Sequence, residues 1–122
     1  MPNRRGAIVV SWASAIPGRE PKLVDVFTRV LKYVGGLKQS GRVEDVRVFV
    51  PKIGAFRDTL MVFGDLDALM AVLFDQELEK LLVEGTIVVQ GLDVQVWEGG
   101  EPNWMSTSPD PYFEQLKKHG FI

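Results

Sequence analysis

The fold of this chain is constrained most by the order in which strand-like and helix-like spacings of apolar residues follow one another. This order determines which elements can share a sheet. Residues 7–13, AIVVSWA, are β-branched and aromatic and precede several prolines and glycines, which is typical of a short strand. From Leu23 to Leu37, apolar residues recur at helical spacing with charged residues between them. This spacing predicts an amphipathic helix of about four turns. Gly41 favours the end of that helix.

Two strands are predicted next. Residues 46–50 and residues 59–63 each alternate between two sets of side chains, as the two faces of a strand require. The two runs are close enough in sequence to pair as a hairpin, with a loop around residues 52–56.

A second helix and a last strand complete the pattern. Residues 64–85 have helical spacing, and the polar run at 75–77 predicts a kink or two short helices that end at Gly85. Residues 86–98 again look like a strand, with a bend or bulge at Gly91.

The chain thus repeats strand, helix, strand twice. This is the order of the α+β, ferredoxin-like split βαβ fold, in which a four-stranded antiparallel sheet carries both helices on one face. The helix-facing side chains are then Val46, Val48, Val50, Leu60, Val62, Leu92, Val94 and Val96.

The opposite face of this sheet is rich in large apolar side chains. By alternation it carries Arg47, Phe49, Thr59, Met61, Phe63, Asp93, Gln95 and Trp97, with either Ile8, Val10 and Trp12 or Val9 and Ser11. Patches of this size usually mark association. We therefore expect a homodimer, a dimeric α+β barrel, joined through the open sheet faces about a two-fold axis. The alternative is a monomer whose C-terminal aromatic residues fold back over the sheet.

Residues 101–122 differ in composition from the domain expected at residues 1–100. They contain three prolines and a Ser-Thr-Ser run before a short helical stretch. Their large aromatic side chains are Trp104, Tyr112, Phe113 and Phe121. Since burying each would contribute roughly 1.5–3 kcal/mol, we expect this C-terminal extension to dock on the domain or on the partner subunit.

Composition argues against several classes of function. The 122 residues include no cysteine, which excludes disulfides, thiolate metal sites and a cysteine nucleophile. The formal net charge is −2 and the basic residues are scattered, so we expect no nucleic-acid partner. No apolar run suits a membrane span or a signal peptide, so we expect a cytoplasmic protein. Phosphate-binding motifs and metal-ligand spacings are also missing, so we expect no cofactor and no metal.

Four stretches resemble the dimeric α+β barrel superfamily. They are IPGRE at the start of the first helix, GLKQSGRVEDVRVFV before the second strand, LMVFGD at the end of the third, and FDQELEKLLVEG before the last. Within that superfamily the chain is similar to stand-alone proteins of the antibiotic-biosynthesis-monooxygenase type and their uncharacterised relatives. The likeness covers roughly Gly6 to Gly99.

In the monooxygenase branch, the resemblance implies asparagine, tryptophan and histidine side chains that orient substrate and oxygen in a pocket without a cofactor. In this chain His119 and Trp104 lie beyond the matched region, and Ser11 is the only polar side chain near the end of the first strand. A catalytic role would therefore require a roomy cavity between helices and sheet with converging polar groups.

Five residues are candidates for substrate binding: Trp12, Arg47, Met61, Phe63 and Trp97. The aromatic and apolar members offer the walls that small-molecule sites use, although packing in a core or interface explains them too. Arg47 shares the predicted open face with Asp93. It would either bind a carboxylate or form a cross-strand or cross-dimer ion pair.

The stretch SAIPGREPKL, at the entrance of the first helix, has two interpretations. Arg19 could bind an anion at the helix N-terminus. Glu20 and Pro21, however, are typical of a first helical turn, which favours a purely structural helix start.

Our leading hypothesis is a small homodimeric α+β barrel protein that binds an apolar or aromatic small molecule. One alternative is a cofactor-independent monooxygenase or isomerase, for which no catalytic residue is assigned. The other is a non-catalytic regulatory or structural module.

Overall fold

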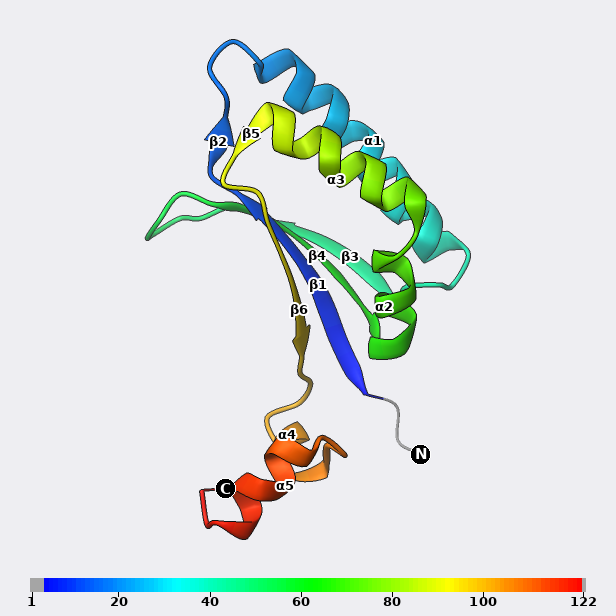
Figure 1. Ribbon diagram of the computed structural model, residues 1–122, viewed down its shortest axis with the longest axis vertical. Coiled ribbons are helices and arrows are strands. Elements are labelled where there is room, and N and C mark those ends of the chain that lie inside the picture. The colour runs from blue at the N-terminus through cyan, green and yellow to red at the C-terminus, as the bar shows by residue number, and fades with distance from the viewer. Residues whose placement is uncertain (1–3, 122) are drawn as a thin grey trace.

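A computed structural model describes residues 4–121 (Figure 1). Residues 1–3 of the expected domain and residue 122 of the expected extension lie outside the described residues. The elements are β1 (Arg5–Trp12), β2 (Ser14–Ala15), α1 (Glu20–Gln39), β3 (Asp45–Phe49), β4 (Asp58–Asp65), α2 (Leu66–Leu73), α3 (Gln76–Val88), β5 (Val89–Gln90), β6 (Asp93–Glu98), α4 (Trp104–Thr107) and α5 (Pro111–Lys118).

The main sheet has the predicted architecture. Its four strands are ordered β3-β4-β1-β6 and every neighbouring pair is antiparallel. Val46, Val62, Ile8 and Val96 form one row across the strands. Since paired residues in an antiparallel sheet point to the same side, this row and the next, Val48, Leu60, Val10 and Val94, confirm the helix-facing residues predicted within β3, β4 and β6. Leu92 precedes β6 but packs on the core, whereas Val50 lies beyond the end of β3, is 57% exposed and, contrary to expectation, does not join the core. Helices α1 and α3 lie together over this face (Figure 1).

The register also decides which side chains of β1 face the helices. Ile8, Val10 and Trp12 point into the helix-covered core, so Val9 and Ser11 lie on the open face. Sequence alternation left this choice open, because β1 is apolar on both faces.

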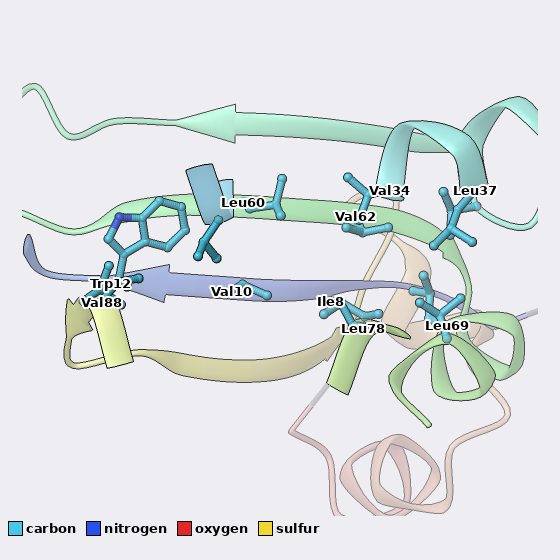
Figure 2. Close-up of a cluster of buried hydrophobic side chains, with 14 residues drawn as sticks. Ile8, Val10, Trp12, Val34, Leu37, Leu60, Val62, Leu69, Leu78 and Val88 are labelled. Carbon is cyan, nitrogen blue, oxygen red and sulfur yellow. The ribbon is translucent and has the colours of Figure 1, made fainter. Parts of the chain in front are cut away.

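The core lies between the sheet and the helices (Figure 2). Its most buried large side chains are Ile8, Val34, Leu60, Leu69 and Val72. The helices are amphipathic, and within residues 4–121 none combines the length and apolarity needed to cross a membrane.

The SAIPGREPKL stretch starts a helix and also forms a second, small sheet. Helix α1 begins at Glu20, with Pro21 in its first turn, as predicted. The Arg19 guanidinium donates a hydrogen bond to the carbonyl of Ile87 near the C-terminal end of α3, where a cation is favourable. Strand β2 pairs with β5, which the sequence pattern did not predict.

The second helical region divides into two helices at its polar run, as predicted. The side chains of Asp65 and Asp75 accept hydrogen bonds from backbone amides at the two helix starts. The expected end at Gly85 is wrong, because α3 continues to Val88. Val88 is buried in the core, and this tertiary packing overrides the strand preference of a Thr-Ile-Val run.

The C-terminal extension lies beyond the end of the sheet (Figure 1). Trp104 of α4 packs edge-on against Phe113 of α5, with ring centroids 4.8 Å apart. Tyr112 packs on Phe113 in the same way at 5.2 Å. Trp104, Tyr112 and Phe113 therefore pack on one another and do not fold back over the open face, while Phe121 is 75% exposed.

Candidate functional site

The structure has a small cavity on the helix side of the sheet. Its volume is about 50 Å³, and its lining consists of aliphatic and aromatic side chains and Gly85. A catalytic role required a roomy cavity with converging polar groups. The described lining offers neither, so this cavity provides no acid, base or oxygen-orienting group.

Trp12 belongs to this core. Trp12 is only 7% exposed and lies among the buried side chains of the core (Figure 2), and its ring is 5.5 Å from that of Phe27 on α1. The Trp12 ring thus fills space between sheet and helix, on the opposite side of the sheet from the other four candidate residues.

The open face is organised in three rows across the strands. In order from β3 to β6 the rows are Asp45, Phe63, Ala7 and Trp97; Arg47, Met61, Val9 and Gln95; and Phe49, Thr59, Ser11 and Asp93. The two central strands, β4 and β1, contribute mostly apolar side chains to it. Charged and amide side chains lie on the two outer strands.

A groove of about 490 Å³ hollows one end of this open face. Met61, Phe63 and Trp97 line it, and Trp97 is 51% exposed. The groove therefore brings together three of the five predicted binding residues. Its polar lining comes from the charged residues Arg5, Glu44, Glu98 and Glu101.

Glycine shapes the floor of the groove. A Cβ atom at Gly6 would lie 2.3 Å from the carbonyl oxygen of Trp97. Because backbone cannot give way as a flexible side chain can, β1 approaches β6 this closely only with glycine at that position.

Gln95 orients the indole of Trp97. The Trp97 Nε1–H donates to Gln95 Oε1 at 2.7 Å, and Gln95 Nε2 donates to Asp93 Oδ2 at 2.7 Å. Sequence reasoning did not single out Gln95 as a site residue. The signal was present, since positions two apart on a strand share a face.

Arg47 lies on the open face but outside the groove lining. Its Nε donates to Asp45 Oδ2 at 2.7 Å, while Lys38 reaches the other oxygen of Asp45 at 3.0 Å. These partners lower the pKa of Asp45 to about 2, chiefly through the Arg47 hydrogen bond. Arg47 and Asp93 share the open face as predicted, but β3 and β6 are opposite edges of the sheet, so Arg47 pairs within the protomer with Asp45 on its own strand.

Carboxylates outnumber cations around the groove. Arg5 pairs with Glu44, and Arg4 pairs with Glu98 through two hydrogen bonds of 2.8 Å. Glu101 adds a further exposed carboxylate at the edge. The rim is therefore negatively charged around an apolar floor.

Arg4 and Glu98 also hold the C-terminal extension at the edge of the sheet. Arg4 Nη2 contacts Asp110 Oδ2 at 2.8 Å, and Ser108 Oγ donates to Glu98 Oε1 at 3.1 Å. The Arg4 hydrogen bond is the main cause that lowers the pKa of Glu98 below its ordinary 4.5. The ionised form of Glu98 is thus the form that anchors the extension.

Acid is expected to release this anchor. The pKa of Glu98 is lower in the folded than in the unfolded protein. The stabilisation that ionised Glu98 gives to the docked extension is therefore complete above about pH 4.5 and is lost as the pH falls through the folded-state pKa. An NMR titration should show the indole signal of Trp104 shifting with a midpoint below 4.5. Glu98→Gln should give the released signal already at pH 7, whereas Glu79→Gln, an exposed change on α3, should not. An unchanged Trp104 signal in Glu98→Gln would contradict the anchoring role.

Two solved structures resemble this chain. One is a dimeric protein of unknown function with a ferredoxin-like fold from Bacteroides fragilis, with a TM-score of 0.57 and 9% identity, covering 78% of this chain and 96% of that one. The other is a protein of unknown function from Nitrosomonas europaea, with a TM-score of 0.52 and 18% identity, covering 79% of this chain and 89% of that one.

No protein-family model matches the chain, and a comparison with curated proteins finds no match. At these identities the structural likeness shows the fold alone. The protein is an α+β protein with the ferredoxin-like fold, as the order of its elements predicted.

Proposed function

We propose that this protein is a homodimer, joined through its open sheet faces, that binds an apolar or aromatic small molecule in the groove formed by Met61, Phe63 and Trp97. The observation that carries the proposal is the groove itself, a mostly apolar hollow on the open sheet face with an exposed tryptophan in its lining.

The arrangement of the open face supports the dimer. Apolar side chains occupy its central strands and polar side chains its edges, which is the pattern of a protein interface with a dry core and a wet rim. Phe49 and Trp97 remain about half exposed at opposite corners of this face. The Bacteroides fragilis protein, which has the same fold, is described as dimeric.

The size and lining of the groove support a small-molecule ligand. Ligand sites commonly measure about 300–1,000 Å³ and combine apolar walls with a few polar groups. The groove falls within that range at about 490 Å³, whereas the helix-side cavity does not at about 50 Å³. Packing two open faces together would shield the groove from water and strengthen contacts with an apolar ligand.

The groove is assigned the binding of an apolar or aromatic small molecule and no chemical reaction. The monooxygenase alternative depended on a polar pocket behind the sheet, and the described residues there are apolar. A regulatory or structural module without a ligand is distinguished by the binding test below.

Truncating Trp97 is expected to weaken ligand binding at least tenfold. N-phenyl-1-naphthylamine, a neutral aromatic probe whose fluorescence rises in apolar surroundings, should bind the wild type saturably with one site per protomer. Trp97→Ala removes the largest apolar wall of the groove, and one aromatic contact is worth roughly 1.5 kcal/mol or more.

Trp104→Ala is the matched control, because Trp104 lies on α4 and does not line the groove. Equal affinity of the wild type and Trp97→Ala would show that the groove is not the site. The absence of saturable binding to the wild type would favour the structural module.

A further inference from the structure

The β3–β4 hairpin extends past the sheet as an apolar arm. Ile53 is 96% exposed and Phe56 is 66% exposed, although both are large hydrophobic residues. Figure 1 shows this hairpin projecting beyond the strands, away from the helices and from α4 and α5. An exposed apolar segment of this kind requires a partner surface.

The base of the hairpin is held in place. Arg57 donates to the carbonyl of Gly91 at 2.6 Å and to Ser11 Oγ at 3.0 Å, which ties the arm to β1 and to the turn before β6. Gly54, at φ +102°, makes the turn at the tip. The arm therefore leaves the sheet in a defined direction.

The groove lies at the other end of the same open face. The row of Met61 is the middle of the face, with Phe49 toward the arm and Trp97 toward the groove. At about 3.3 Å per residue, Ile53 lies up to about 20 Å from this row on one side, and Glu101 lies up to about 20 Å from it on the other.

A two-fold axis that runs across the strands at the Met61 row would place the hairpin end of one protomer over the groove end of its partner. A face can pack on its own copy only if the axis lies in the plane between the two sheets. With the axis across the strands, each strand lies opposite its own copy running the other way, so the hairpin of each protomer lies opposite the β3–β4 side of the other's groove, which Glu44 and Phe63 line. Both contacts form at once, because the interface is isologous.

Charge favours this pairing. The hairpin carries Lys52 beside its apolar residues, while carboxylates outnumber cations in the groove lining and Glu44 lies on its β3–β4 side. A positive apolar arm therefore faces a negative apolar groove. If the axis ran along the strands instead, the two Lys52 side chains would approach each other.

We propose that the β3–β4 hairpin of one protomer lies over the groove of its partner and completes the ligand site with Ile53 and Phe56. This inference rests on the proposed homodimer and specifies its geometry. Each dimer then has two sites, and each site is built from both subunits.

Cross-linking tests the geometry directly, because the chain contains no cysteine of its own. The variant with Ile53→Cys and Glu44→Cys should form covalent dimers with a short bismaleimide at least tenfold faster than either single variant. Within one protomer the two positions lie at opposite ends of the sheet, beyond the reach of the reagent. Rapid cross-linking of Ile53→Cys alone would instead place hairpin against hairpin and overturn the proposal.

Substitution of the hairpin tests its place in the site. Ile53→Asp with Phe56→Asp should lower the affinity for N-phenyl-1-naphthylamine at least tenfold, measured at protein concentrations where sedimentation shows a dimer. Val24→Asp places the same charge on an exposed valine of α1 and should change nothing.

The two proposals fail in different ways. A wild-type protein that sediments as a monomer overturns both. A dimer without cross-links between positions 53 and 44, or with unchanged probe affinity in the hairpin variant, overturns only the role of the hairpin and leaves the homodimer standing.

Discussion

Met61→Asp is expected to convert the protein from dimer to monomer, weakening self-association at least 100-fold. Met61 lies on a central strand in the middle row of the open face. In a face-to-face dimer its replacement would bury a carboxylate without a partner, which costs roughly 3–5 kcal/mol. Since about 1.4 kcal/mol corresponds to a factor of ten, sedimentation velocity at micromolar concentration should show monomers.

Met70→Asp is the matched control for this experiment. Met70 is an exposed methionine on α2, away from the open face, so its substitution should leave the dimer intact. Circular dichroism should confirm that both variants remain folded. If Met61→Asp sediments as a dimer as stable as the wild type, the open face is not the interface.

Trp12→Ala is expected to cost roughly 3–5 kcal/mol of unfolding free energy, the usual range for removing a buried aromatic side chain. Trp12 is buried against Phe27 in the core, and its loss would leave a cavity between β1 and α1. For a domain with a total stability of about 5–15 kcal/mol, this loss is large. Urea denaturation followed by circular dichroism measures it.

Two comparisons separate the core role of Trp12 from a role in the site. Trp12→Phe keeps most of the ring and should cost clearly less than Trp12→Ala. Trp97→Ala should change the unfolding free energy by less than about 1 kcal/mol, because its side chain is half exposed. Stability close to the wild type in Trp12→Ala would contradict the assignment of Trp12 to the core.

The order of the helices and strands was predictable because apolar side chains recur with a different spacing in each kind of element. Alternation identified β3 and β4, helical spacing identified α1, and the polar run at Asp75 divided α2 from α3. The end of α3 was not predictable, since residues 86–88 prefer strands and only burial of Val88 in the core keeps them helical.

The candidate site was predictable in part. Alternation placed Met61, Phe63 and Trp97 on one face, and the structure brings them into one groove. Trp12 could not be assigned to a face, because the strand around it is apolar on both sides. The partner of Arg47 within the protomer, Asp45 on the same strand, was not predicted, because alternation assigns residues to a face but does not say which of them make contact.

The sequence by itself determined the periods of the elements, and the periods determined the fold: local spacing decides which side chains share a face, and the order of strands and helices leaves few ways to bury those faces. Only the tertiary structure decided where the hollow lies. Gly6, where β1 approaches β6 too closely for a side chain, lines the groove, and α4 and α5 extend past the sheet instead of covering its open face. Such positions depend on pairing register and packing between residues far apart in sequence, which no local pattern contains.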